Sequence, residues 1–161
     1  MAGYEVCVCY LTRVRPDGRR EVLLGRKRTG LGLGKIVGPG GKVEPGESPI
    51  EAIVREVREE TGIHVAADAL RQVGRLEYGF PFREGWSQNS TVFVGEQWQG
   101  EPVASDELQP TWFSVDAVPF DEMWDDAKYW LPAVLAGDGV HAWFTFAADN
   151  QTVAESSLPL A

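Results

Sequence analysis

The stretch GKVEPGESPIEAIVREVREETGI, residues 41–63, decides how the surrounding chain folds. Its segment SPIE, residues 48–51, predicts the start of a helix, because serine caps helix N-termini, proline suits the first turn and glutamate completes a capping box. Gly62 predicts the end of that helix, because glycine adopts the left-handed conformation that terminates helices. We therefore expect a helix from about Pro49 to about Thr61.

Three carboxylates fall on one stripe of this expected helix. With about 100° of rotation per residue, Glu56, Glu59 and Glu60 lie within one sector. Carboxylates three and four residues apart repel each other, and a bound cation such as Mg²⁺ or Mn²⁺ would remove that repulsion. A solvated acidic face is the alternative interpretation. The neighbouring sector is apolar and predicts packing on a core; it holds Ile50, Ile53, Val54 and Val57.

The whole run also matches a known motif. Residues 41–63 fit G-x5-E-x7-R-E-U-x-E-E-x-G-U at every position, where U is a bulky apolar residue. This pattern is the Nudix box, so the chain resembles the Nudix hydrolases. The resemblance implies a Mg²⁺-dependent enzyme in which water attacks a diphosphate with help from the metal. It also implies an α+β Nudix fold, an α/β/α sandwich in which helices flank a mixed β-sheet.

The resemblance assigns roles to individual residues. Arg55 would orient a carboxylate such as that of Glu59, and Gly40 and Gly41 would let the backbone approach the phosphates. Glu107 is assigned as an extra acid near the metal, with a solvated side chain as the alternative. The implied catalytic set comprises Arg55, Glu56, Glu59, Glu60 and Glu107. The implied metal site comprises Glu59 and Glu60 as main ligands, together with Glu56, Gly40 and Glu107.

Composition supports one ordered domain over residues 1–161. The formal net charge of −9 disfavours polymeric nucleic acid as a partner, because such binding needs a basic surface. We find neither a long apolar run nor a signal peptide, so we expect a cytoplasmic protein that uses no membrane. We also expect a monomer. Cys7 and Cys9 are expected to be buried thiols, because their spacing on a strand is unsuited to a disulfide.

The rest of the chain predicts strands and a second helix. Residues 4–14 are apolar on both faces, which indicates an interior strand. The second helix is expected at residues 127–135, with Pro132 interrupting it near its first turns. The last dozen residues are polar and expected to be loose. Further strands are expected at residues 21–27, 70–82, 87–98, 108–115 and 141–146, the last of which closes the set.

A more specific resemblance extends over residues 4–147. Segments outside the box are similar to the animal-type oxidised purine nucleoside triphosphatases, or 8-oxo-dGTP diphosphatases. The resemblance implies hydrolysis of a nucleoside triphosphate, such as 8-oxo-dGTP, to the monophosphate and pyrophosphate, which would clean the nucleotide pool. The segments read VLLG (22–25), GPGGKV (38–43), PVASDE (102–107), VPFDEMWDD (118–126) and YWLP (129–132).

The same resemblance implies a pocket for the base. Trp124 would stack on the purine, and Asp126 would read the base edge. Lys27 and Leu31 would lie near the substrate, beside the glycines of the loop. Trp124 and Trp130 could instead belong to the core, which is the commonest place for tryptophan.

The chain departs from that relative at three pocket positions. Ala127 stands in place of the second of two adjacent acids, Val37 in place of an asparagine, and Leu31 in place of a phenylalanine. Loss of a hydrogen-bond partner in a buried site changes how the site discriminates between bases. Two alternatives therefore stay open. One is a Nudix hydrolase of a dinucleoside polyphosphate, a nucleotide sugar or another dNTP, and the other is a non-catalytic nucleotide-binding domain.

Overall fold

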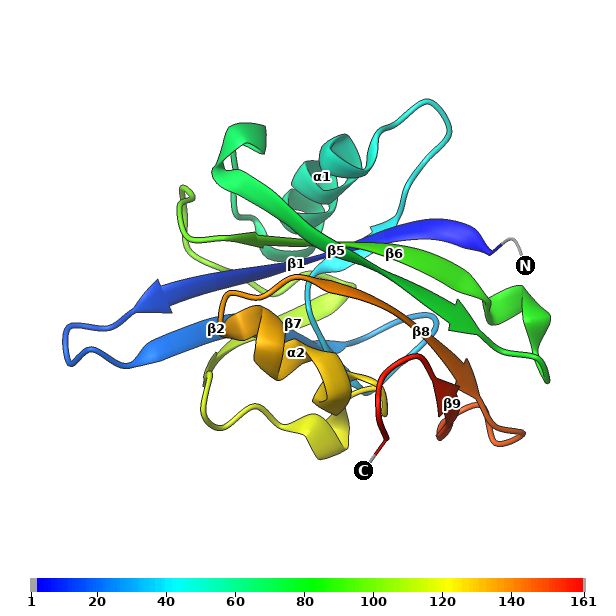
Figure 1. The fold of residues 1–161 in the computed structure, drawn as a ribbon. Coiled ribbons are helices and arrows are strands. Elements are labelled where there is room, and N and C mark those ends of the chain that lie inside the picture. Colours follow the sequence, from blue (N-terminus) through cyan, green and yellow to red (C-terminus); the bar gives the residue numbers. More distant parts are fainter. Residues whose placement is uncertain (1–2, 161) are drawn as a thin grey trace.

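A computed structural model describes residues 3–160 and shows a mixed sheet between two helices (Figure 1). Helix α1 spans Pro49–Thr61 and helix α2 spans Ala127–Leu135. Within the described residues the sheet has nine strands. They are β1 (Tyr4–Val14), β2 (Arg20–Lys27), β3 (Ile36–Val37), β4 (Gly40–Lys42), β5 (Leu70–Gly79), β6 (Gln88–Gly95), β7 (Leu108–Ser114), β8 (Val140–Phe146) and β9 (Val153–Ser156).

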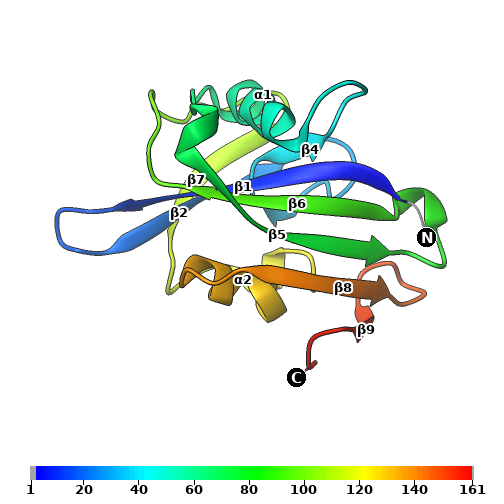
Figure 2. The same ribbon diagram turned by 45° about the horizontal axis from the view of Figure 1, so that its top comes forward.

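The sheet combines parallel and antiparallel pairs. Its strand order is β3-β2-β1-β6-β5-β8-β9, with β4 paired to β1 and β7 paired to β2. The pairs β1–β6 and β5–β8 are parallel, whereas the other pairs are antiparallel. Figure 2 shows α1 over one face of the strands and α2 under the other. The α+β fold and its sandwich of helix, sheet and helix are thereby confirmed.

Helix α1 begins and ends where the local sequence predicts. The Ser48 side chain accepts the Glu51 N–H, and the Glu51 carboxylate accepts the Ser48 N–H at 2.9 Å, which completes the capping box. Gly62 has φ 78° and donates its N–H to the Arg58 carbonyl, which ends the helix. These caps hold the acidic stripe of α1 at a defined position over the sheet.

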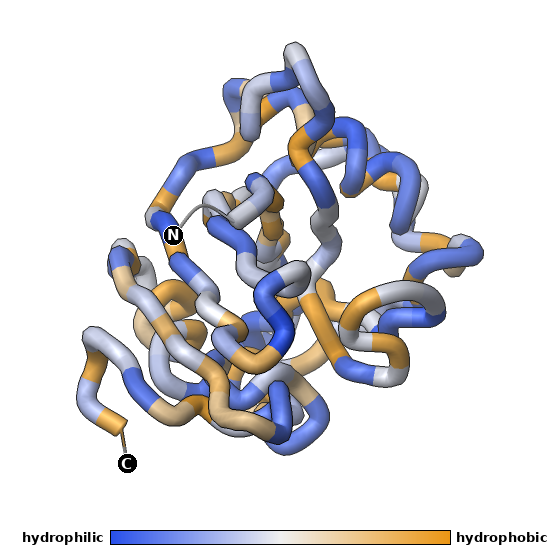
Figure 3. The backbone as a smooth tube through the Cα atoms, turned by 90° about the vertical axis from the view of Figure 1, so that its right-hand side faces the viewer, coloured by the Kyte–Doolittle hydropathy of each residue, from blue (hydrophilic) through white to orange (hydrophobic). Residues whose placement is uncertain are grey.

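Strand β1 separates two apolar cores. Its residues Cys7, Cys9 and Leu11 face α1, where they pack with a cluster that includes Ile53 and Val57. Tyr10 belongs to the opposite cluster, beneath α2. Both cysteines are buried free thiols, in agreement with the expectation. The chain trace in Figure 3 mixes apolar and polar segments through the middle of the fold, whereas its outer loops are mostly hydrophilic.

Four expectations about the chain after α1 are wrong. The strand set does not close at residue 146, because Val153–Ser156 forms β9 and pairs with β8. The C-terminal region is therefore partly ordered rather than loose. Pro132 lies inside a continuous α2 and does not interrupt it. The 70–82 strand ends earlier, at Gly79, shortly before Pro81, which has no N–H for the ladder.

Candidate active site

Helix α1 and the start of β7 bring three acids together. One carboxylate oxygen each from Glu56, Glu60 and Glu107 lies within 4.8 Å of the other two. Glu56 and Glu60 are four residues apart on α1, and Glu107 immediately precedes β7. Oxygen ligands at this spacing suit a hard divalent cation, which would also neutralise their mutual repulsion. The residues present therefore fit a metal site.

Glu60 is the most buried acid of this cluster. Its exposed fraction is 4%, and its Oε1 accepts the Gly40 N–H at 2.9 Å. Burial raises the pKa of Glu60 to about 8, with Glu56 and Glu107 adding to the rise and Lys27 opposing it. Burial also raises the pKa of Glu56, although Arg55 opposes that rise. A carboxylate with this environment gains most from a nearby positive charge.

Arg55 links the acids of the box. Its guanidinium contacts both Glu47 oxygens, at 2.7 and 2.8 Å. The same group donates to Glu56 at 2.8 Å and to Glu59 at 3.2 Å, and it also donates to the Lys42 carbonyl at 3.0 Å. Arg55 thus fixes the orientation of the Glu56 carboxylate, which belongs to the acid cluster. It also holds the pKa of Glu47 down, at about 2.

Glu59 lies outside the close cluster of three acids. Its side chain is 48% exposed and makes its ion pair with Arg55. Its role as a main metal ligand stays a prediction. Glu107 was interpreted either as an extra acid near the metal or as a solvated side chain. In the structure it is exposed and also belongs to the acid cluster.

Gly40 and Gly41 allow the close approach of β4 to its neighbours. A Cβ on Gly40 would lie 2.1 Å from the Cys7 carbonyl oxygen, and a Cβ on Gly41 would lie 2.6 Å from the Glu56 carboxyl carbon. Any side chain at either position would therefore displace β1 or the acid cluster. The glycines give the acids of α1 room beside the sheet.

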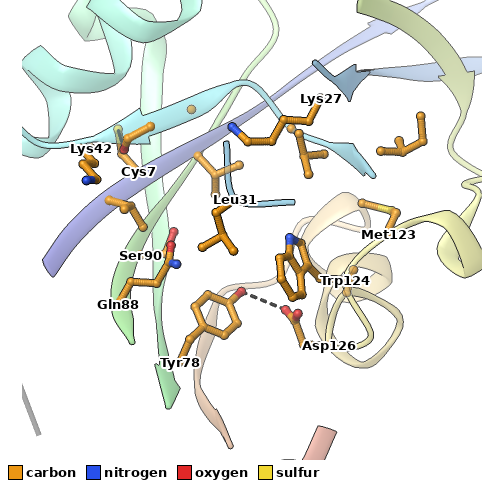
Figure 4. A pocket seen from close by; sticks show the side chains of 18 of the residues that line it. Cys7, Lys27, Leu31, Lys42, Tyr78, Gln88, Ser90, Met123, Trp124 and Asp126 are labelled. Carbon is orange, nitrogen blue, oxygen red and sulfur yellow. Dashed lines mark hydrogen bonds between the residues drawn. The ribbon is translucent and has the colours of Figure 1, made fainter. Parts of the chain in front are cut away.

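One cavity joins Glu60 of the acid cluster to the face of the sheet that carries α2. Its volume is about 310 Å³, and Glu60 lies at its wall. Figure 4 shows Lys27 near one end of this cavity, and Trp124 and Asp126 farther along. All the residues expected to bind substrate line it, namely Lys27, Leu31, Gly40, Gly41, Trp124 and Asp126.

The two tryptophans that could belong to the core have different environments. Trp130 is 4% exposed and sits edge-to-face with Tyr10 in the core under α2. Both tryptophans line the cavity, but Trp124 is only partly buried, and Phe80, Trp86 and Phe146 meet it edge-to-face. These contacts hold the Trp124 indole in place, so that it can offer an aromatic face to a ligand.

Asp126 is a buried acid with two donors. Its exposed fraction is 3%, and its Oδ2 accepts hydrogen bonds from the Tyr78 hydroxyl at 2.8 Å and from Trp130 Nε1 at 2.7 Å. Burial raises the pKa of Asp126, and both donors oppose that rise. Its neighbour Asp125 bonds to Lys128 and to the Val153 N–H instead. Asp126 is thus the member of the pair that faces the cavity.

Comparison with known proteins identifies the family. Residues 3–134 match the family model described as the NUDIX domain. The chain belongs to the Nudix family. The match covers the box, the acid cluster and the Trp124–Asp126 region of this Nudix domain.

This Nudix domain is similar to proteins named as nucleotide hydrolases. It is 39% identical over 126 residues to an oxidized purine nucleoside triphosphate hydrolase of Danio rerio, covering 78% of this chain and 79% of that protein. It is 35% identical over 139 residues to the enzyme of the same description from Mus musculus, covering 86% of each. A crystal structure of a MutT protein from Bacillus halodurans is similar with a TM-score of 0.79 and 29% identity, covering 96% and 97% of the two chains.

The Nudix domain also lines its cavity with polar residues that the sequence did not single out. Tyr78 on β5 and Gln88 and Ser90 on β6 all reach it. The alternation of residues along the hairpin could have revealed them. Gln88 lies opposite Tyr78, and Ser90 lies opposite the buried Leu76. The three positions that depart from the relative, Leu31, Val37 and Ala127, line the same cavity as apolar groups.

Proposed function

We propose that this protein hydrolyses a nucleoside triphosphate to the monophosphate and pyrophosphate in a Mg²⁺-dependent reaction. The proposed substrate is an oxidised purine nucleotide such as 8-oxo-dGTP, so that the enzyme cleans the nucleotide pool. The observation that carries the proposal is the single cavity that joins Glu60 of the acid cluster to Trp124 and Asp126. The names of the relatives in zebrafish and mouse support the substrate class.

Mg²⁺ is the proposed cofactor, and Mn²⁺ offers similar coordination. Glu56, Glu60 and Glu107 would hold the ion, and we propose Glu59 and Gly40 as further contributors. When bound, the ion supplies charge neutralisation at the phosphates and activation of water.

The chain's own residues prepare the reaction in three ways. Arg55 keeps Glu56 and Glu59 oriented through its direct contacts with both. Lys27 lines the cavity close enough to Glu60 to influence its pKa, and its ammonium is proposed to pair with phosphate oxygens. Trp124 stacks on the base and Asp126 accepts its N–H groups, which fixes the nucleotide relative to the acids.

Steady-state release of pyrophosphate from 8-oxo-dGTP, compared with dGTP and other nucleotides, tests this proposal. We expect Mg²⁺-dependent release, with a higher kcat/KM for the oxidised nucleotide. Absence of turnover on every nucleotide tested would contradict it. Assays with the same set of nucleotides also test two alternative functions.

The first rival is a Nudix hydrolase of a dinucleoside polyphosphate, a nucleotide sugar or another dNTP. Val37 and Ala127 favour it, because they remove polar groups from the cavity wall. Faster turnover of one of these compounds would support it. The second rival is a non-catalytic nucleotide-binding domain, which the intact box argues against. Thermal stabilisation by nucleotide without any turnover would support that rival.

We propose that residues 1–161 act as one catalytic domain and as a monomer in the cytoplasm. Pairing of β8 with β5 supports the single domain, because it joins the chain beyond residue 134 to the same sheet. Within residues 3–160, no helix is long and apolar enough to cross a membrane. Light scattering coupled to size-exclusion chromatography checks the oligomeric state. The net charge of −9 supports a small nucleotide, bridged by metal, over polymeric nucleic acid.

A further inference from the structure

Strand β6 presents two polar side chains to the cavity. Gln88 and Ser90 are two residues apart, so their side chains leave the strand on the same face. In Figure 4 they lie together on one side of the cavity, and Trp124 and Asp126 lie on the other, with Tyr78 and Leu31 between them. A flat ligand stacked on Trp124 would therefore have Asp126 at one edge and β6 at the opposite edge.

The amide of Gln88 is fixed by its protein contacts. Its Nε2 donates to the Trp86 carbonyl at 3.1 Å and to the Tyr4 hydroxyl at 3.2 Å. A backbone carbonyl can only accept, so the contact with Trp86 settles which end of the amide carries hydrogen. No donor among residues 3–160 reaches Oε1, which leaves the Gln88 carbonyl oxygen as an acceptor in the cavity wall.

Ser90 offers an unused hydroxyl beside this oxygen. The residue is 4% exposed and lines the cavity, yet its hydroxyl makes no hydrogen bond with any other described residue. Since Ser90 lines the cavity, its hydroxyl is available there to donate a hydrogen bond to a ligand or to accept one.

We propose that Gln88 Oε1 and Ser90 Oγ form a recognition pair for the imidazole edge of an 8-oxopurine. This proposal rests on the proposed function and names the groups that select the oxidised base. Asp126 accepts N–H groups from the Watson–Crick edge, which turns N7 and C8 of the purine toward β6. An 8-oxopurine carries a hydrogen on N7 and an oxygen on C8, so Gln88 accepts the first and Ser90 donates to the second.

An unmodified purine matches this pair poorly. Its N7 is an acceptor and its C8 carries only hydrogen, so the N7 lone pair would face the Gln88 oxygen. Two acceptors that face each other in a buried site leave both without a partner. Gln88 is therefore the stronger discriminator, because the Ser90 hydroxyl can also donate to an unmodified N7. Gln88 and Ser90 thus provide hydrogen-bonding groups on β6, whereas Val37, which replaces an asparagine of the relative, provides none.

The test measures binding of the product-like monophosphates 8-oxo-dGMP and dGMP by titration calorimetry in metal-free buffer. We expect the wild-type protein to bind 8-oxo-dGMP at least about tenfold more tightly, as loss of a buried hydrogen bond implies. Gln88→Met should abolish most of this preference, and Ser90→Ala should reduce it several-fold. Gln88→Asn, which keeps the amide but withdraws its oxygen from the cavity, is the second variant should the Met variant melt early.

Gln72→Met is the matched control, because Gln72 lies on the neighbouring strand β5 with an exposed side chain. Its preference for 8-oxo-dGMP should equal that of the wild type. The proposal is overturned if the wild type shows no preference, or if folded Gln88 and Ser90 variants keep it in full. Pyrophosphate release from 8-oxo-dGTP is measured separately. Loss of preference in the variants without turnover in the wild type would refute the proposed function and leave the recognition pair standing.

Discussion

The acid cluster and the base pocket are built in different ways. The acids on α1 are braced by residues nearby in the sequence: Arg55 donates to Glu56, and the Gly40 N–H donates to Glu60. The base pocket instead depends on partners far apart in sequence, such as Tyr78 with Asp126. A site held by local contacts tolerates substitutions elsewhere in the chain. A pocket built from several distant segments can be altered in one segment while the others stay unchanged. In this Nudix domain the wall around the base can therefore change without disturbing the acids.

The largest expected effect comes from the acids of α1. Glu60→Gln and Glu59→Gln should each leave less than about a tenth of the wild-type turnover, because a neutral amide removes charge from the metal site. The measurement is kcat at saturating Mg²⁺, with a melting curve to show that the fold survives. Glu155→Gln, an exposed acid on β9, is the control and should keep full activity. Substantial turnover in the Glu59 variant would remove that half-exposed residue from the set of ligands.

Trp124→Ala tests the other side of the comparison. Loss of stacking on one base should raise KM about tenfold or more while kcat changes less, because the acids are untouched. Trp124→Phe should restore most of the binding. Trp143→Ala, an exposed tryptophan on β8, is the matched control. Equal losses in kcat and in kcat/KM would show that the pocket and the acid cluster are not separable.

Arg55→Lys probes the local bracing of the box. A single ammonium group cannot hold Glu47 through two bonds and also reach Glu56, so the acids should lose their orientation. We expect a fall in kcat of about tenfold and a higher Mg²⁺ requirement. Arg58→Lys on the exposed face of the same helix should behave as wild type. An unchanged Mg²⁺ dependence in the Arg55 variant would place its role outside the metal site.

The smallest effect concerns stability and pH. The pKa of Glu60 rises from 4.5 to about 8 on folding, so between these values the metal-free folded state binds more protons than the unfolded state. Its contribution to stability is complete below pH 4.5 and is lost as the pH rises through about 8. Melting temperatures of metal-free wild type should therefore fall by a few degrees relative to Glu60→Gln across this range. Added Mg²⁺ should stabilise the wild type most at high pH. A constant difference between the two proteins at all pH values would contradict this linkage.

Local signals in the sequence predicted α1 well. The Ser48 cap and the Gly62 stop act within a few residues, so they operate in the same way before and after the sheet assembles. Long-range features were less accessible. Strand β9 was missed because its residues carry no clear alternation, and their pairing with β8 defines them. The approach of Glu107 to α1 followed from the resemblance alone, since no spacing rule connects it with Glu60.

The residues of the base pocket likewise differ in how well the sequence predicted them. The resemblance predicted that Trp124, Asp126 and Lys27 lie near the substrate, and in the structure all three line one cavity. Gln88 and Ser90 were not found, because a polar residue on a strand reveals nothing until its face and its neighbours are known. Tyr78 was likewise assigned only to a strand, although its hydroxyl donates to Asp126. Hydrogen-bond partners across a sheet depend on register, which the chain acquires only on folding.

The buried thiols of β1 bear on survival in the conditions that oxidise nucleotides. Burial raises the pKa of Cys7 to about 12, and it raises the pKa of Cys9 as well. The thiolate is the form that peroxides attack, so burial lowers the reactivity of the Cys7 thiol. Although Cys7 lies at the wall of the cavity, it is a poor target for the oxidants that would generate the proposed substrate. Burial of the two thiols thus slows one route by which these oxidants could inactivate the protein.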